Sequence, residues 1–236
     1  MKRYRQVAGF ILAGGASSRM GRDKGLLDFG GVPLIVHTAR LLQPIVAEVT
    51  VVGSPNRYAK FGLRAIADKA QAQHGLESSG RGPLAGIATA LSATLLPWNL
   101  VVACDLPYLS AKWLDWLLSR ALFSHAEAVV PRTECGLEPL AAVYRRECGS
   151  QIAGALAHGV RKVSDAIEKL GVEFVYPREW RHADSGGFVL RNMNGPEDYE
   201  EARKWWLTVQ SSERAHVRKP RRAPKRKRRS APRRNK

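Results

Sequence analysis

The chain has 236 residues, which is enough for one large domain or two small ones with a sizeable hydrophobic core. A hydrophobic content of 44% and a mean hydropathy of −0.27 are typical of a soluble globular protein. The longest apolar runs fall well short of the roughly 20 residues that a membrane-spanning helix needs, so we expect no transmembrane segment.

The cysteines and histidines exclude two further classes of protein. The three cysteines are odd in number and none has C-x-x-C spacing, which argues against a disulfide framework and against a zinc site. The six histidines show no metal-ligand spacing either. We therefore expect a protein of the reducing cytoplasm.

The net charge of +17 comes largely from the end of the chain. Residues 218–236 carry 12 of the 38 basic residues and no acidic residue, which leaves +5 on the other 217 residues. From about residue 213 the sequence has no apolar periodicity and contains three prolines. We predict a folded domain over residues 1–212 and a disordered basic tail over 213–236. Such a tail would attract nucleic acid or another anionic surface, or it would only keep the protein in solution.

Apolar runs of strand length alternate with amphipathic runs of helix length along the domain. Prolines at 33 and 196 and the serine at 110 mark the starts of three helices. The alternation predicts a three-layer α/β fold, with a mainly parallel central sheet covered by helices on both faces. The expected strands are 6–13, 47–53, 99–105, 127–132, 138–147 and 172–177, and the expected helices are 33–42, 83–96, 110–123, 149–159, 162–171 and 196–210.

The stretch "ILAGGASSRMGRDKGLL", residues 11–27, has the composition of a phosphate-binding loop. Glycines let the backbone approach an anion and present N–H groups to it. Arg19 can donate two hydrogen bonds to phosphate oxygens, and Lys24 adds a mobile positive charge. The spacing fits neither G-x-x-x-x-G-K-[ST] nor G-x-G-x-x-G, the two best-known patterns. The residues alone leave open a nucleotide site or a strand-to-helix turn with two surface cations.

The same stretch resembles the signature L-A-G-G-x-S-x-R-M-G-x-D-K of the molybdenum cofactor guanylyltransferases, which are MobA-type nucleotidyltransferases. Every specified position is matched, by Leu12, Ala13, Gly14, Gly15, Ser17, Arg19, Met20, Gly21, Asp23 and Lys24. Three more stretches follow in the family's order: "GPLAGIATAL" (82–91), "VVACDLPYL" (101–109) and "NMNGPEDY" (192–199), where Gly195 replaces the family's Thr. The resemblance covers about residues 6–210 and implies a Rossmann-like nucleotidyltransferase fold.

The activity that the resemblance implies is transfer of GMP from GTP to the terminal phosphate of molybdenum-molybdopterin, with release of pyrophosphate. The acceptor phosphate is already an anionic nucleophile, so no serine, cysteine or histidine nucleophile is needed. The reaction requires groups that hold two anions together and neutralise the charge that builds on the phosphates. Arg19, Lys24, the loop N–H groups and a divalent ion would meet that requirement.

The divalent ion implied is Mg²⁺, which prefers oxygen ligands and often uses only one or two carboxylates beside substrate phosphates. Asp105 follows the apolar run "LVVAC" and matches the metal-binding and catalytic aspartate of the family. From its residues alone, it could equally be a solvated aspartate that caps the next turn. Asn194 is a second candidate ligand, and it could equally be a turn residue before Pro196.

The nucleotide contacts are also implied by the resemblance. The doublet Gly14-Gly15 favours GTP, because related cytidylyltransferases tend to have L-A-A-G there. Asn56 and Asp68 match the polar contacts of the guanine and its ribose, although both could be loop caps. Glu138 lies where the family has its acceptor-side segment. The complete set of expected nucleotide-binding residues is Leu12, Ala13, Gly14, Gly15, Lys24, Asn56, Asp68 and Asp105.

Two alternative functions stay open at this point. A nucleotidyltransferase of the same fold could use CTP on molybdopterin, or could act on a sugar phosphate. A protein of a different class could bind nucleic acid through the basic tail and use the domain as a nucleotide sensor. The sequence does not define the oligomeric state, for which a monomer is the favoured expectation.

Overall fold

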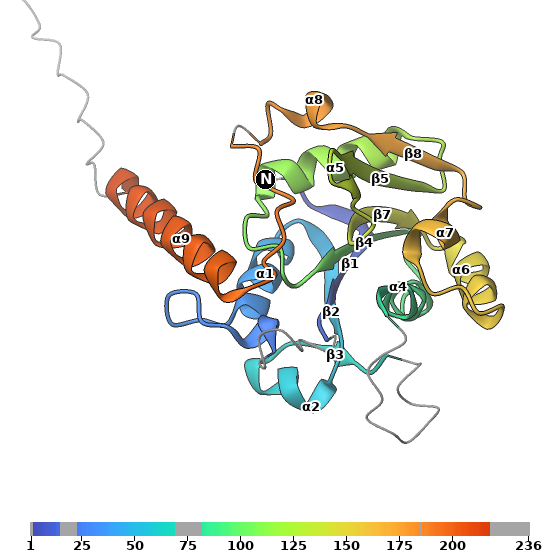
Figure 1. Cartoon of the computed structure of the whole chain (residues 1–236), viewed down its shortest axis with the longest axis horizontal. Helices are drawn as coiled ribbons and strands as arrows, with labels where there is room; N and C mark the ends of the chain where they lie inside the picture. Colours follow the sequence, from blue (N-terminus) through green and yellow to red (C-terminus); the bar gives the residue numbers. More distant parts are fainter. Residues whose placement is uncertain (1, 15–22, 69–81, 185, 218–236) are drawn as a thin grey trace, which may run out of the picture.

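The computed structural model describes residues 2–14, 23–68, 82–184 and 186–217, with side chains as far as residue 209 (Figure 1). The described strands are β1 (Tyr4–Leu12), β2 (Val46–Val52), β3 (Ala65–Ile66), β4 (Trp98–Ala103), β5 (Ala128–Thr133), β6 (Gly136–Leu137), β7 (Ala141–Arg145) and β8 (Val172–Val175). The described α-helices are α1 (Leu34–Leu42), α2 (Pro55–Tyr58), α4 (Pro83–Ser92), α5 (Ala111–Phe123), α6 (Cys148–Ala157), α7 (Val163–Ile167), α8 (Pro177–Trp180) and α9 (Pro196–Val217).

The strands form one eight-stranded sheet in the order β3-β2-β1-β4-β7-β5-β6, and β8 pairs with β5. β3, β2, β1 and β4 are parallel to one another, and β8 is parallel to β5. β7 is antiparallel to both β4 and β5. The predicted α/β class with a mainly parallel sheet is therefore confirmed.

The reversed direction of β7 follows from the short connection that precedes it. Only residues 134–140 separate β5 from β7, and β6 occupies two of them. A parallel connection needs a crossover of a dozen or more residues, so a strand reached by so short a link must return antiparallel. The alternation of strands and helices predicted a strand here but not its direction.

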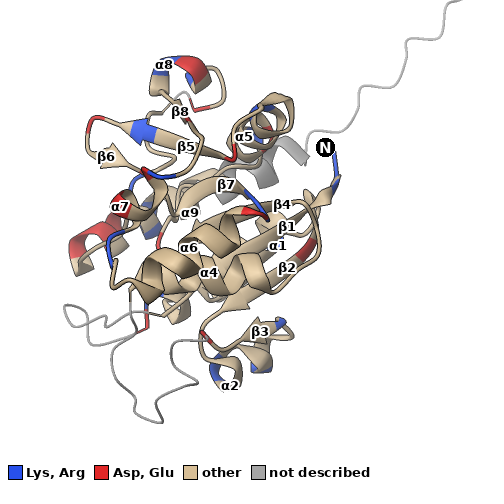
Figure 2. Cartoon of the chain, turned by 90° about the vertical axis from the view of Figure 1, so that its right-hand side faces the viewer, with Lys and Arg blue, Asp and Glu red and all other residues tan. Residues whose placement is uncertain are grey.

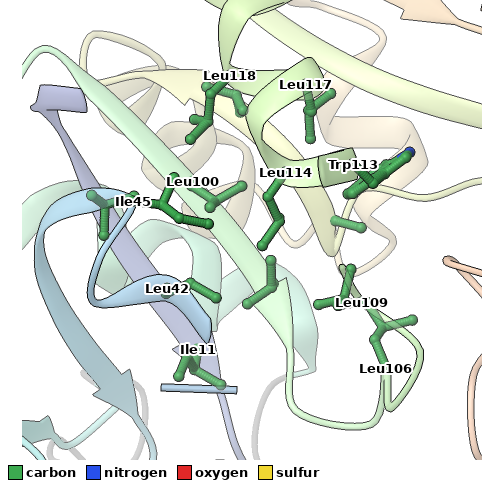
Figure 3. Close-up of a cluster of buried hydrophobic side chains, with 14 of the residues drawn as sticks. Ile11, Leu42, Ile45, Leu100, Leu106, Leu109, Trp113, Leu114, Leu117 and Leu118 are labelled. Atoms are coloured by element: carbon green, nitrogen blue, oxygen red, sulfur yellow. The ribbon is translucent and has the colours of Figure 1, made fainter. Parts of the chain in front are cut away.

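Helices cover both faces of the sheet and bury two apolar cores (Figure 1). α4 and α6 pack side by side on one face, and α4 carries no charged residue (Figure 2). α1 and α5 cover the other face, where large aliphatic side chains and Trp113 fill the space above β1 and β4 (Figure 3). Trp113 is fully buried, and Trp116 is partly buried against the same core.

The boundaries of α1, α5 and α6 agree with the predicted helices to within two residues, whereas α4 ends at Ser92, four residues before the predicted end, and α2 was not predicted. The Ser110 hydroxyl caps α5 by accepting the N–H of Trp113 at 3.2 Å. α7 ends at Ile167, shorter than the predicted helix, and β8 stops before Pro177, which begins α8. α9 continues to Val217, so the first residues assigned to a disordered tail from 213 are helical.

Two further predictions concern the basic tail and transmembrane segments. The rest of the basic tail, residues 218–236, lies outside the described residues. Among the helices that the structure describes, none is both long enough and apolar enough to cross a membrane.

Gly53 marks a close approach of two strands at one edge of the sheet. It follows β2, and a Cβ added to it would lie 2.1 Å from the carbonyl oxygen of Ala13, just after β1. The N–H of Ala13 donates to Val52 O at 2.9 Å and that of Gly53 to Ile66 O at 2.9 Å. These backbones cannot separate without breaking those hydrogen bonds.

We expect Gly53→Ala to lower the free energy of unfolding by about 1–3 kcal/mol, because the added methyl group overpacks a rigid backbone contact. Urea denaturation measures the change. Gly154→Ala is the matched control, since Gly154 lies within α6 and a Cβ there meets nothing within 4 Å. That control should be stabilised by up to about 1 kcal/mol. Equal stability of the Gly53→Ala protein and the parent would contradict the close approach.

Candidate active site

The carboxyl ends of β1, β2, β3 and β4 lie at one edge of the sheet, because these strands are parallel and in register. Leu12 pairs with Val52 on one side and with Ala103 on the other. The Cys104 N–H extends the pairing by donating to Leu12 O at 3.0 Å. Open α/β sheets bind ligands outside this edge. This edge is therefore the expected position of a nucleotide site.

The glycine loop leaves β1 at this edge. Gly14 is exposed and has φ of +127°, and no atom of the described residues lies within 4 Å of the place where a Cβ would be. Ala13 is buried and Leu12 is partly buried below it. The predicted residues Gly15 and Arg19 lie outside the described residues, so their roles stay predictions.

Lys24 and Asp105 meet at the centre of the edge, although 81 residues separate them in the chain. The Lys24 Nζ donates to the Asp105 Oδ2 at 3.0 Å, and both side chains are partly buried, with exposed fractions of 18% and 24%. Lys24 begins the short 3-10 helix η1 (Lys24–Leu26), and Asp105 lies just beyond β4. A cation and a carboxylate expected to serve one reaction are thus within contact distance.

Asp23 anchors the end of the glycine loop, a role that the sequence analysis did not assign. Its Oδ1 accepts the N–H of Gly25 at 2.9 Å and so caps η1. Its Oδ2 accepts hydrogen bonds from Arg57 at 2.8 Å and from the Tyr58 hydroxyl at 2.7 Å. Tyr58 is fully buried, and burial, together with the Asp23 carboxylate, raises the pKa of its phenol. The only signal for this role was that Asp23 is a specified position of the family signature.

Asn56 and Asp68 lie at the same edge but are held differently. Asn56 is exposed on α2, immediately before the two residues that bind Asp23. Asp68 follows β3, and its Oδ1 accepts a hydrogen bond from the Thr89 hydroxyl of α4 at 3.1 Å. This bond gives Asp68 a structural contact. Recognition of the guanine or its ribose by either residue stays a prediction.

The segment that carries Asn194 is tied directly to Asp105. The N–H of Met193 donates to the Asp105 backbone oxygen at 2.9 Å, and the Met193 side chain is fully buried. Asn194 itself is exposed and comes just before Gly195 at the start of α9. The structure therefore brings the two predicted metal ligands to neighbouring backbone positions.

The replacement of the family's Thr by Gly195 leaves the geometry of this segment unstrained. A Cβ at Gly195 would meet only the Asp198 Oδ2, at 4.0 Å. Asp198 accepts the N–H groups of Asn194 and Gly195 at 2.8 and 2.9 Å. These two hydrogen bonds lower the pKa of the Asp198 carboxyl, and the positive charges of Arg191 and Lys24 lower it further.

Glu138 lies on the other side of β4, in the link between β6 and β7. Its Oε1 accepts the Thr133 hydroxyl at 3.2 Å, and burial raises the pKa of its carboxyl. Leu140, two residues later, accepts the N–H of Ala103 at 2.7 Å, so this link adjoins the end of β4. An acceptor-side role for Glu138 stays a prediction.

The donor chemistry at this edge suits a small hard cation. Asp105 offers a partly exposed carboxylate, and Asn194 offers an amide oxygen on the adjoining segment. Mg²⁺ uses oxygen ligands and commonly takes few of them from the protein. Within the described part of the chain, no cluster of three or more His, Cys, Asp or Glu side chains is arranged to hold a metal. Cys104 is buried, and burial raises the pKa of its thiol, so it is not a poised nucleophile.

A glycine-rich sequence after β1, a contact between Lys24 and Asp105 just beyond the end of β4 and a mixed α/β sheet are typical of nucleotide-binding proteins of the Rossmann-like class. The MobA-like NTP transferase domain family matches residues 9–174. The chain belongs to this family of nucleotidyltransferases.

Curated relatives extend the match over most of the chain. A probable molybdenum cofactor guanylyltransferase from Pelotomaculum thermopropionicum is 33% identical over 199 residues, which cover 84% of this chain and 92% of the relative. A molybdenum cofactor guanylyltransferase from Pseudomonas aeruginosa is 33% identical over 190 residues, covering 79% and 89% of the two chains.

Solved structures support the fold. Molybdopterin-guanine dinucleotide biosynthesis protein A from Archaeoglobus fulgidus has a TM-score of 0.72 and 23% identity, covering 85% of this chain and 99% of that one. A 2-C-methyl-D-erythritol 4-phosphate cytidylyltransferase from Thermus thermophilus has a TM-score of 0.61 and 21% identity, covering 88% and 100%.

The two partners of the Asp23 Oδ2 give a test of how the loop is anchored. We expect Tyr58→Phe to lower the free energy of unfolding by about 1.5–3 kcal/mol, because it removes a buried hydrogen bond to a charged group. Arg57→Ala should cost less than about 1 kcal/mol, since Arg57 is half-exposed and its ion pair is screened by water. Urea denaturation of both variants measures the difference. The anchor is disproved if the two variants lose equal stability or neither loses any.

Proposed function

We propose that this protein transfers GMP from GTP to the terminal phosphate of molybdenum-molybdopterin and releases pyrophosphate. Family membership and the names of the curated relatives support the proposal. The observation that carries it is the contact between Lys24 and Asp105, just beyond the carboxyl end of β4. This contact supports the proposal because it brings the cation proposed to bind phosphate next to the carboxylate proposed to bind the metal.

The chemistry is a displacement at the α-phosphorus of GTP. An oxygen of the acceptor phosphate forms the new P–O bond, and the bond from the α-phosphorus to the bridging oxygen of the β-phosphate breaks. Pyrophosphate leaves with that oxygen. Both reactants are anions, so the protein's main task is to hold them together and offset their charge. In this proposal Arg19, Lys24 and the loop N–H groups offset the charge on the phosphates.

The metal proposed is Mg²⁺, held by Asp105 and Asn194. When bound, it would neutralise phosphate charge as a Lewis acid. Lys24 occupies one oxygen of Asp105 in the described structure. Its flexible side chain can instead reach toward phosphate oxygens when a nucleotide is bound.

Base selection is assigned to the first loop and to two polar side chains. Leu12, Ala13, Gly14 and Gly15 bring backbone against the nucleotide, while Asn56 and Asp68 contact the guanine and ribose. Gly14 supports this role, because its open, positive-φ conformation leaves its backbone accessible. Acceptor binding is assigned to the side of β4 where Glu138 lies. We further propose that the protein acts as a cytoplasmic monomer.

A nucleotide panel tests the proposed substrate. With Mg²⁺ and molybdenum-molybdopterin, we expect pyrophosphate release from GTP at least about 10-fold faster than from CTP, ATP or UTP, because the turn carries two glycines. A coupled pyrophosphate assay measures the rates, and Asp105→Asn serves as the inactive reference. Pyrophosphate release from CTP but not from GTP would show that the protein is a cytidylyltransferase and not a guanylyltransferase. Pyrophosphate release only when a sugar phosphate is present would show that the acceptor is a sugar phosphate and not molybdenum-molybdopterin.

The basic end of the chain supports a second candidate function, which is binding of nucleic acid or another anionic surface. The supporting observation is the 12 basic residues and absence of acidic ones in residues 218–236. Such charge gives affinity that falls steeply as salt rises, without sequence specificity.

Removal of residues 218–236, after the end of α9, separates the two functions. We expect transferase activity to remain within about 2-fold of the parent and binding of a fluorescent DNA duplex at 50 mM salt to fall at least about 10-fold. Fluorescence anisotropy at several salt concentrations measures the binding. A full-length protein with the tail's basic residues changed to Gln is the control for length. Loss of transferase activity on truncation would instead place the tail in the enzyme's own function.

A further inference from the structure

Asp198 lies at the junction between α9 and the segment that carries Asn194. Its Oδ2 accepts the N–H groups of Asn194 and Gly195, and its Oδ1 lies 3.8 Å from an Arg191 nitrogen. Asp198 is only partly exposed and occupies the third position of α9. One carboxylate therefore fixes two consecutive backbone groups just before the helix.

The same short segment is fixed at its other end by Asp105. The Met193 N–H donates to the Asp105 backbone oxygen, and the Met193 side chain is buried in a cluster with Phe29 and Tyr108. Asn194 thus stands between one residue held by Asp105 and one held by Asp198. Its backbone has little freedom while both contacts exist.

The glycine at 195 makes Asp198 more important in this chain. Gly195 is the N-cap of α9, since its carbonyl oxygen accepts the Tyr199 N–H at 3.1 Å. A threonine there would cap the helix with its own hydroxyl. Glycine has no such group, and Asp198 makes the only side-chain hydrogen bonds that the described structure shows to the N–H groups of Asn194 and Gly195.

Lys24 adds an electrostatic link. Its positive charge is close enough to favour the ionised form of Asp198, while its ammonium contacts Asp105.

We infer that Asp198 is a positioning residue for the metal site, which holds Asn194 beside Asp105 through its backbone hydrogen bonds. This inference rests on the proposed function, because it assumes that Asp105 and Asn194 bind the cation. Groups that orient metal ligands typically change metal affinity 10- to 100-fold when they are removed.

Four variants separate positioning from simple helix capping. Asp198→Ala removes both hydrogen bonds. Asp198→Asn keeps an amide oxygen that can accept them but loses the charge. The double variant Asp198→Ala with Gly195→Ser restores a helix cap through the serine hydroxyl but offers nothing to the Asn194 N–H. Glu197→Ala is the matched control, because Glu197 is an exposed carboxylate in the same first turn.

The test uses two readouts. The first is the binding of Mn²⁺ without nucleotide, measured by electron paramagnetic resonance. The second is the Mg²⁺ concentration that gives half-maximal transfer. We expect Asp198→Ala to weaken Mn²⁺ binding and to raise the half-maximal Mg²⁺ concentration, each by about 10-fold. Asp198→Asn should stay within about 3-fold of the parent, and Glu197→Ala should match it. The double variant should regain thermal stability without regaining metal affinity.

Three outcomes would overturn the inference. Parental Mn²⁺ affinity in Asp198→Ala, or recovery of affinity in the double variant, would make Asp198 a helix cap only. Mn²⁺ binding by Asp198→Asn as weak as that by Asp105→Asn would make Asp198 a ligand itself. Parental Mn²⁺ binding by Asp105→Asn would remove the metal site and the inference with it. Because Mn²⁺ binding is measured without nucleotide, it tests the role of Asp198 even if the nucleotide panel shows that the protein does not prefer GTP.

Discussion

The parallel alignment of β2, β1 and β4 is the constraint on which the candidate site depends. Leu12 pairs with Val52 and with Ala103, so the three strands end together. Each strand then releases its chain at the same edge, and the side chains that follow are close whatever their separation in sequence. The contact between Lys24 and Asp105 is the direct result. The buried cores on both faces of the sheet keep this alignment rigid.

Two braces outside the sheet fix the chain segments that flank this contact. Asp23 ties the end of the glycine loop to α2, using a buried tyrosine and a surface arginine. At the other side, α9 holds the residues after the loop: the Tyr199 hydroxyl donates to Asp28 O at 2.8 Å, and Trp206 packs against Gly30. Gly30 has a positive φ, and a Cβ there would overlap the indole ring. Residues of α2 and α9 thereby fix the backbone on both sides of Lys24.

The sequence was sufficient for the layers and for most helix boundaries, because strand patterns carry that information. Motif order assigned Lys24 and Asp105 to one site, and the structure shows them in contact. The sequence was insufficient where the decisive fact is a contact between distant residues. The direction of β7 depends on its pairing with β4 and β5, which it reaches after a short link. The anchor role of Asp23 depends on Arg57 and Tyr58, which no spacing connects to it. The helical end of α9 past residue 212 lacks the apolar periodicity on which the prediction relied.

The reversed strand β7 also divides the edge of the sheet into two working areas. β4 and β5 point the same way but lie two strand spacings apart, about 10 Å, because β7 stands between them. Within the described sheet, β5 pairs only with β6, β7 and β8. Insertions or exchanges around β5 can therefore remodel one area while the strands under the glycine loop stay in register. The pairing pattern therefore separates the strands around β5 from the register that aligns β2, β1 and β4.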